Sequence, residues 1–296
     1  MTRQLTVIEL IEDSAAQLEA VGMSLANGFG QGTLNAFDEA AWLVLWALKI
    51  PLHDLDSVSN QAVNDENRAL VATFLVARIT TRQPLAYLTK EAWLQGVAFY
   101  VDERVIIPRS FIAELLLDES IDPWLSDETY KVLDLCTGNG SLAVLAAMAY
   151  PDVVIDAADI SADALAVARI NVDRHDMAQR ITLIESDGLN ACKGRYDLIL
   201  CNPPYVNAAT MAALPAEFKA EPPLALASGV DGMDFIRGIF LTISTHMSEN
   251  AVLVLEIGNE RENFELAFPS LKPLWFETSG GPDQVLLLTR QQLLQQ

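Results

Sequence analysis

Two kinds of apolar run alternate along the carboxyl-terminal two-thirds of the chain. Short, nearly continuous runs have the length of buried strands, and longer runs have the three-to-four-residue period of helices. They predict strands at 132–135, 153–158, 181–185, 196–201, 251–257 and 285–289, and helices at 142–150, 162–175 and 235–247. Because strands that are apolar on both faces belong to parallel sheets with helices on each side, we expect an α/β fold with a mostly parallel sheet.

Residues 7–82 show a helical pattern instead. Apolar residues recur near helical spacing at Ile8, Ile11, Leu18, Val21 and Leu25. Glycines then interrupt the pattern, and Asp38 is suited to cap a second helix. A third helix is expected at 65–80, with an apolar side formed by Leu70, Phe74 and Ile79. The pattern predicts a separate helical domain at 1–90.

A β-prone stretch joins these two regions. Apolar runs at 92–101 and 105–107 flank the polar residues 102–104, which predicts a hairpin that turns at 102–104. We therefore expect a β-hairpin linker at 91–108 and a second domain at 109–296. Ser110 is placed to cap the first helix of that domain.

The composition is that of a globular protein. The 296 residues are 51% hydrophobic and 20% charged, and the length is sufficient for two domains. The apolar run at 40–50 is too short to span a membrane, and the amino terminus lacks the apolar core of a signal peptide. We therefore expect a cytoplasmic protein that does not bind membranes.

The charge balance argues against nucleic acid as a direct partner. The chain has 19 Lys and Arg against 40 Asp and Glu, a net charge of −21. Binding to a phosphate backbone requires a basic surface. An acidic surface is compatible with a small cationic cofactor or a basic protein partner, and it also serves solubility alone.

The cysteines and histidines form no ligand pattern. The three cysteines are Cys136, Cys192 and Cys201, and their spacing fits neither a disulfide framework nor a zinc site. We expect no metal, and we interpret Cys136 and Cys201 as small core residues in apolar strands.

The tetrapeptide Asn202-Pro203-Pro204-Tyr205 is the first candidate site. It follows the strand at 196–201, and two prolines cannot continue a sheet, so an amide and an aromatic ring are held at the carboxyl end of that strand. Ligands of open α/β sheets bind at this edge. The pair suits a planar group with an NH2, such as adenine, cytosine or a carboxamide. The alternative is a proline-rich turn without function.

A glycine-containing loop is the second candidate site. It lies between the first sheet strand and its helix and contains Asp134, Cys136, Thr137, Gly138, Asn139 and Gly140. The glycines let the backbone approach a ligand closely, and the helix amino terminus offers free N–H groups. The same pattern also fits a dinucleotide fingerprint.

Acidic residues follow the next two strands. Asp159 can accept hydrogen bonds from the ribose hydroxyls of a nucleoside, as in enzymes that use NAD or S-adenosylmethionine. Its alternative role is a helix cap, for which Ser161 is better placed. Asp187, followed by Gly188, can hold an adenine amino group or simply form a turn.

The polar groups at the sheet edge favour methyl transfer over hydride transfer. A dehydrogenase needs a proton-handling group, commonly His or Lys, and this edge offers Asn and Tyr. Methyl transfer from a sulfonium needs an aligned nucleophile. An oxidoreductase and a non-catalytic binding module remain as alternatives.

The motifs together resemble a known family. The pattern Asp-x-x-x-Gly-x-Gly followed by Asn-Pro-Pro-Tyr is similar to class I S-adenosylmethionine-dependent methyltransferases, which have a Rossmann-like, mostly parallel seven-stranded sheet. Further segments resemble the HemK-type protein-(glutamine-N5) methyltransferases: 82–88, 99–105, 107–110, 221–222, 225–226 and 229–232. Segments 86–93 and 108–110 resemble the PrmB branch, which methylates a glutamine of large-subunit ribosomal protein three.

The resemblance implies a role for each candidate residue. Residues 136–140 would line the methionine part of S-adenosylmethionine, with Asp134 and Asn202 also at the cofactor, and Asp159 would bind its ribose. Asp187 and Gly188 would lie beside the adenine. Asn202, Pro203, Pro204 and Tyr205 would bind the substrate glutamine, with Asn202, Pro203 and Tyr205 catalytic.

Two positions depart from the family pattern. Asn139 stands where Ser or Thr is commoner, and Gly188 stands where the release-factor branch often has a bulky residue. The resemblance implies S-adenosylhomocysteine as the product and a basic ribosomal protein, before its assembly, as the partner. The alternatives are glutamine methylation of peptide chain release factors and adenine N6 methylation of nucleic acid. The helical domain at 1–90 would recognise the substrate.

Overall fold

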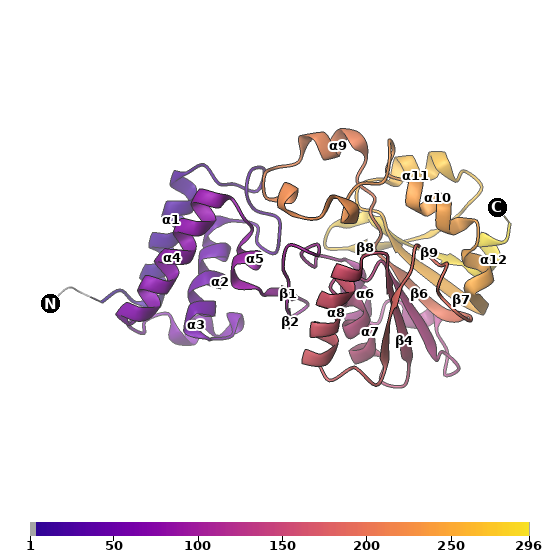
Figure 1. Ribbon diagram of the computed structural model, residues 1–296, viewed down its shortest axis with the longest axis horizontal. Helices are drawn as coiled ribbons and strands as arrows, with labels where there is room; N and C mark the ends of the chain where they lie inside the picture. The colour runs from indigo at the N-terminus through magenta and orange to yellow at the C-terminus, as the bar shows by residue number, and fades with distance from the viewer. Residues whose placement is uncertain (1–3, 296) are drawn as a thin grey trace. The chain divides into compact units, whose positions relative to one another are not determined.

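The computed structural model describes residues 4–295, which form two compact units (Figure 1). The first unit consists of the chain up to Ala92 together with Leu214–Glu221. The second consists of Trp93–Ala213 and the chain from Pro222 onward. Within the described range, no helix is both long enough and apolar enough to cross a membrane.

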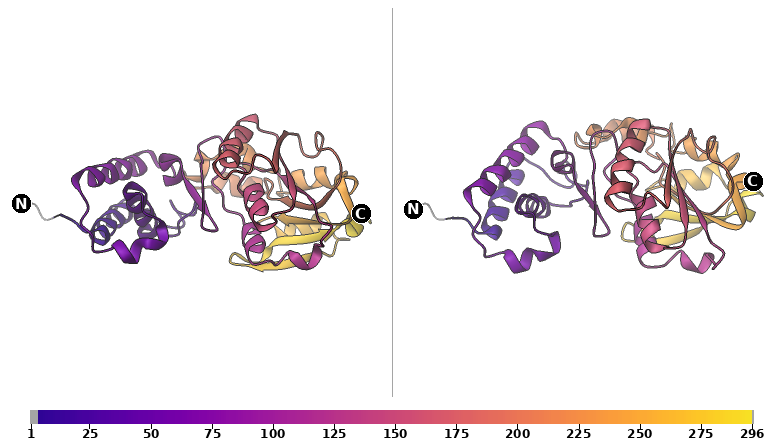
Figure 2. Two further views of the ribbon diagram at one scale, coloured as in Figure 1. Left: turned by 90° about the horizontal axis from the view of Figure 1, so that it is seen from below. Right: turned by 60° about the horizontal axis from the view of Figure 1, so that its bottom comes forward.

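The first unit is helical, as expected. Its helices are α1 (Val7–Ala20), α2 (Ala36–Leu48), α3 (Leu55–Val58), α4 (Asp65–Thr81) and α5 (Leu85–Thr89). Helix α2 packs against α1, α4 and α5. Figure 2 shows the ribbon from two further sides. The cap of α2 differs from the prediction, because the Asn35 side chain accepts the backbone N–H of Asp38 at 2.9 Å. Asp38 is therefore in the first turn of α2, not at its cap.

The buried face of α4 is also different from the predicted one. Val71, Leu75 and Arg78 are buried, whereas Leu70, Phe74 and Ile79 are only partly covered. Arg78 is 1% exposed because Nε donates to Glu39 at 2.7 Å and Nη1 donates to Glu217 at 3.1 Å. Buried charges need such partners. A hydrophobicity pattern cannot place an arginine in a core.

Glu217 explains why a distant segment belongs to the helical unit. Its side chain is fully buried, and its Oε1 also accepts the Nε–H of Arg82 at 2.6 Å. The segment Leu214–Glu221 therefore leaves the second unit, joins the helices and returns, although the sequence places it within 109–296.

The hairpin is present, but it turns at a different place. Strands β1 (Ala92–Leu94) and β2 (Val97–Phe99) pair around Gln95 and Gly96, whose φ values are 49° and 75°. Positive φ at both central residues is the geometry of a tight hairpin turn. The predicted turn at 102–104 is instead a local loop in which Asp102 accepts from Arg104, and 105–107 is not a strand.

The second unit is built on a seven-stranded sheet. Its strands are β3 (Lys131–Leu135), β4 (Val154–Asp159), β5 (Ile181–Glu185), β6 (Tyr196–Cys201), β7 (Met247–Glu256), β8 (Leu274–Thr278) and β9 (Gly281–Thr289). Their order is β5-β4-β3-β6-β7-β9-β8. The first five strands in this order are parallel, and β9 runs antiparallel to both β7 and β8. The order reverses between β3 and β6, which is where open α/β sheets bind ligands.

Helices cover both faces of the sheet (Figure 1). One face packs on α6 (Ile112–Leu117), α7 (Ser141–Ala149) and α8 (Ala162–Arg174). The other packs on α10 (Asp234–Phe240), α11 (Arg261–Ala267) and α12 (Arg290–Leu293). Along β6 the side chains alternate, so Leu198 and Leu200 face the first layer, and Ile199 and Cys201 face the second. This alternation confirms a sheet that is buried on both sides.

Several predicted boundaries are wrong. The helix expected at 235–247 ends at Phe240 and is followed by a 3₁₀ turn, Ile243–His246. Strand β7 begins at Met247, not at 251. The prediction missed its start because residues 248–250 are polar. Strand β8 was not predicted, since its apolar run, Leu274–Phe276, is only three residues long. The remaining elements are α9 (Ala208–Ala213) and 3₁₀ turns at Leu52–Asp54, Asp122–Trp124, Phe218–Ala220 and Pro223–Ala225.

Candidate active site

The glycine loop between β3 and α7 has an unusual backbone. Cys136, Gly138 and Gly140 have φ values of 64°, 54° and 80°. Gly140 is also pressed against α8, because a Cβ there would lie 3.1 Å from the Cβ of Ala168. The loop is held at the sheet by the Thr137 N–H, which donates to the Ala158 carbonyl at 3.0 Å. Glycine is required where the left-handed conformation and the close approach coincide.

Polar atoms without partners face this loop. Asp134 is fully buried, and its Oδ2 accepts from the Thr137 hydroxyl and from the Ala143 N–H at 3.0 Å. Its Oδ1 and the Nδ2 of Asn139 are buried and have no hydrogen-bond partner among residues 4–295. Burial raises the pKa of Asp134 to about 7. Buried polar atoms of this kind are satisfied when a polar ligand binds beside them.

Asp159 lies next to the glycine loop. Its Oδ2 accepts the Gly138 N–H and its Oδ1 accepts the Ser161 N–H, each at 2.9 Å. Burial raises the pKa of Asp159. Ser161, as the alternative interpretation predicted, caps α8 by accepting from Ala164 at 3.1 Å. The carboxylate of Asp159 is therefore left at the sheet edge.

Asp187 and Gly188 form the turn after β5. The Ser186 N–H donates to the Asp159 carbonyl at 2.9 Å, which brings this turn beside Asp159. Asp187 is exposed, and its carbonyl accepts the Asn190 N–H at 3.2 Å. Gly188 has a φ of 54°. The turn geometry fits both predicted roles of Asp187, because a turn residue can still present a free carboxylate.

Asn202 stands at the end of β6 with a free amide. The register pairs Leu135 of β3 with Cys201 of β6, so the glycine loop and Asn202 leave the sheet from adjacent strands. Asn202 is half-buried, and in the described part of the chain its side chain has no hydrogen-bond partner. An oriented amide with free donors and acceptors is a binding group for a polar, planar ligand.

Tyr205 and the residue after it are held by contacts with three other segments of the second unit. The ring of Tyr205 lies against Gly258, where a Cβ would be 2.6 Å from Cε2. The Tyr205 carbonyl lies against Gly232, where a Cβ would be 2.2 Å from the oxygen. The Val206 N–H donates to the Leu226 carbonyl at 2.8 Å. The loop Asn202-Pro203-Pro204-Tyr205 is thus packed on glycines and tied to a neighbouring segment.

Two cysteines meet at this edge. Cys201 is buried in β6, as predicted. The prediction is wrong for Cys136, which lies just beyond the end of β3 and is only partly buried, but its thiol lies beside Cys201. The contact with Cys201, together with burial, raises the pKa of Cys136. The contact between Cys136 and Cys201 was not predicted, because the two residues are far apart in the sequence. Among the described residues, all three cysteines are free.

Sequence reasoning missed Asn171. From α8, its Nδ2 donates to the Asn139 carbonyl at 2.8 Å and to the Tyr100 carbonyl at 2.9 Å, and its Oδ1 accepts the Tyr100 N–H at 2.7 Å. Asn171 therefore joins the glycine loop to the segment that follows the hairpin. An Asn among the buried apolar positions of a helix was the available signal.

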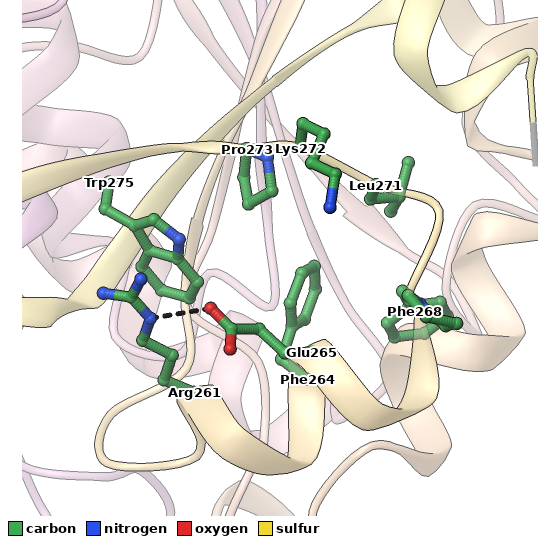
Figure 3. A pocket seen from close by; sticks show the side chains of 9 residues that line it. Arg261, Phe264, Glu265, Phe268, Leu271, Lys272, Pro273 and Trp275 are labelled. Atoms are coloured by element: carbon green, nitrogen blue, oxygen red, sulfur yellow. Dashed lines mark hydrogen bonds and ion pairs between the residues drawn. The ribbon is translucent and has the colours of Figure 1, made fainter.

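A separate hollow lies beside α11 and β8 (Figure 3). Its volume is about 420 Å³, and it contains none of the site residues predicted from the sequence. Arg261 stacks over the Trp275 ring at 4.5 Å and donates to Glu265 at 2.8 Å. The hollow is therefore distinct from the site at the sheet edge.

The sheet order and the loops at its carboxyl edge define the class as a class I methyltransferase. A family model described as "Methyltransferase small domain" matches residues 113–229. The catalytic domain of hMettl16, crystallised with a MAT2A 3′UTR hairpin, has the same fold, with a TM-score of 0.53, 13% identity and coverage of 83% of this chain and 91% of that one.

Curated relatives narrow the assignment. The ribosomal protein uL3 glutamine methyltransferase of Bordetella pertussis (strain Tohama I) is 48% identical, over 97% of this chain and 96% of its own length. The enzyme of the same name from Burkholderia pseudomallei (strain K96243) is 45% identical, over 97% of this chain and 95% of its own length. The chain belongs to this ribosomal protein uL3 glutamine methyltransferase family.

Proposed function

We propose that this protein transfers a methyl group from S-adenosylmethionine to the side-chain nitrogen, N5, of a glutamine in ribosomal protein uL3. The observation that carries the proposal is the free amide of Asn202, which the register of β3 and β6 places beside the glycine loop. The kinship with uL3 glutamine methyltransferases supports the same reaction. It also favours this reaction over methylation of release factors or of adenine.

The residues at the sheet edge fit the cofactor. The positive-φ loop that contains Cys136, Thr137 and Gly138–Gly140 would enclose the methionine part, next to the unpartnered Oδ1 of Asp134. The carboxylate of Asp159 would accept from the ribose hydroxyls, and Asp187 with Gly188 would lie at the adenine. When bound, S-adenosylmethionine supplies an electrophilic methyl group on a sulfonium.

Asn202 and Pro203 would prepare the glutamine. An amide nitrogen is a weak nucleophile because its lone pair is delocalised into the carbonyl. If the Asn202 Oδ1 and the Pro203 carbonyl accept the two N–H bonds, they orient the nitrogen and increase its electron density. Pro204 stiffens the loop, and Tyr205 would pack on the amide plane. The methylated nitrogen loses a proton readily, so no strong general base is needed.

The acidic chain suits a basic substrate. A net charge of −21 would attract a basic ribosomal protein in the cytoplasm before that protein binds RNA, and it would disfavour RNA itself. The helical unit would supply part of the recognition surface. Substrate affinity should weaken as salt rises, because salt screens exposed charges. Affinity that does not change between low and high salt would contradict this role of charge.

The function is tested by incubating the purified full-length enzyme with labelled S-adenosylmethionine and separate acceptors. The acceptors are unassembled uL3, a release factor and an adenine-containing RNA. We expect label on uL3 alone, and mass spectrometry should place one methyl group on a glutamine. Label on a release factor or RNA, with none on uL3, would refute the proposed substrate.

A further inference from the structure

The segment that follows β7 supports the substrate loop at two points. Gly258 lies against the Tyr205 ring, and Glu260 holds the side chain of Asn207. Gly232 completes the support, because a Cβ there would meet the Tyr205 carbonyl and would lie 3.4 Å from the Glu260 carboxyl carbon. One short segment therefore contacts both the ring and the far end of the loop.

Glu260 is held in one orientation. It is 8% exposed, and its Oε1 accepts from Asn207 Nδ2 at 2.6 Å, while its Oε2 accepts from Asn263 Nδ2. The Glu260 N–H donates to the Ile257 carbonyl at 3.2 Å. With both oxygens and the backbone engaged, Glu260 is a rigid acceptor for Asn207.

Asn207 is fixed from both sides of its amide. Its Oδ1 accepts the Thr210 N–H at 2.9 Å and so begins α9, and its Nδ2 donates to Glu260. Asn207 cannot rotate its amide by half a turn without losing both bonds. The bond to Glu260 therefore sets where the chain goes after Tyr205.

We propose that Glu260 is a positioning residue for methyl transfer, which acts through Asn207 to hold the loop Asn202-Pro203-Pro204-Tyr205 in its reactive geometry. The inference rests on the proposed function of this loop. Strand β6 fixes the loop at Cys201, and the two prolines transmit little flexibility. At its far end the loop is held by the bond from the Val206 N–H to the Leu226 carbonyl and by the contact of Asn207 with Glu260, and of these two only the second depends on side chains. A small displacement of positioned groups slows a reaction strongly.

A pair of isosteric substitutions tests the contact. Asn207→Asp keeps the acceptor for Thr210, and Asp is a good helix cap, but it places two carboxylates against each other. Glu260→Gln is the matched control, because the new amide can still accept from Asn207 when Asn263 turns its own amide. In the double variant, the glutamine at 260 donates to the aspartate at 207 and accepts from Asn263. The hydrogen bond between positions 207 and 260 is thus restored, with donor and acceptor exchanged.

We expect Asn207→Asp to lower kcat by about 10-fold, with KM for uL3 and the affinity for S-adenosylhomocysteine changed by less than about 2-fold. Glu260→Gln should remain within about 3-fold of wild type, and the double variant should recover to the same range. A wild-type kcat in Asn207→Asp, or a double variant as slow as Asn207→Asp, would overturn the proposal.

Hydrogen exchange separates this inference from the proposed function. If wild-type enzyme does not methylate uL3, the proposed function fails, but the contact can still be tested in the free protein. The Val206 N–H, which is bonded to the Leu226 carbonyl, should exchange faster in Asn207→Asp and recover in the double variant. Equal exchange in all variants would show that Glu260 does not position the loop.

Discussion

The aromatic ring of Tyr205 lies against the backbone of Gly258, so closely that a Cβ at residue 258 would be 2.6 Å from Cε2. Gly258 also has a φ of 53°, in the left-handed region. Position 258 therefore excludes a side chain for two reasons, the conformation and the contact. The ring proposed to pack on the substrate amide is placed by the chain that follows β7.

Replacing Gly258 by Ala should slow methylation of uL3 by on the order of 10-fold or more, because the Tyr205 ring must move. Gly96→Ala is a matched control, since Gly96 has a φ of 75° and a Cβ added there would meet no atom within 4 Å. Both substitutions carry a similar backbone strain. Steady-state rates that fall equally in the two variants would show that the Tyr205 contact is not responsible.

Replacing Asp159 by Asn should weaken the binding of S-adenosylhomocysteine by about 10-fold or more, because one of the two oxygens at the ribose position becomes a donor. Isothermal titration calorimetry measures this directly. Asp163→Asn is the control, because it removes an exposed acidic charge from the first turn of α8 and leaves the loop intact. Equal affinities in both variants would place the ribose elsewhere.

The stability of the second unit should depend on Glu256. This side chain is buried, and its Oε2 accepts from the Ser110 hydroxyl at 2.6 Å and from the Phe111 N–H at 2.9 Å. Burial raises the pKa of Glu256 to about 7. The folded protein therefore keeps a proton that the unfolded chain, with a pKa of about 4.3, has already lost. The free energy of unfolding should fall as pH rises from about 4 to 7.

Urea denaturation at pH 5 and pH 8 tests this dependence. Glu256→Gln keeps an oxygen for the Ser110 hydroxyl and the Phe111 N–H and cannot titrate. It should therefore reduce the loss of stability between these pH values by on the order of a few kcal/mol. The pKa of buried Asp134 is also raised, so the free energy of unfolding of the Glu256→Gln variant should still fall somewhat as pH rises. Identical pH dependence in wild type and variant would contradict the raised pKa.

The sequence predicted the strands that are apolar on both faces and the loops that follow them. Strands β5 and β6 were placed at their observed boundaries, 181–185 and 196–201. The prediction failed for elements that have little or no apolar pattern. The start of β7 and the hairpin turn at Gln95 and Gly96 lack an apolar pattern, and the apolar run of the edge strand β8 is only three residues long.

Contacts between segments far apart in the chain also could not be predicted from the sequence. Nothing near Arg78 indicates that Glu217, far along the chain, will enter the helical unit and pair with it at 3.1 Å. The candidate site was found from the residues proposed to contact ligands directly, such as Asn202 and Asp159. Gly258 and Glu260, which contact Tyr205 and Asn207, carry no recognisable motif of their own.

The central claim is that Asn202 activates a glutamine nitrogen, and a single measurement tests it. Purified Asn202→Ala enzyme should bind S-adenosylhomocysteine with nearly wild-type affinity and methylate uL3 on the order of 10²-fold more slowly, as expected for the loss of one positioned polar group. Single-turnover rates with saturating uL3 measure the transfer step itself. A variant that binds the cofactor normally and methylates uL3 at the wild-type rate would contradict the account.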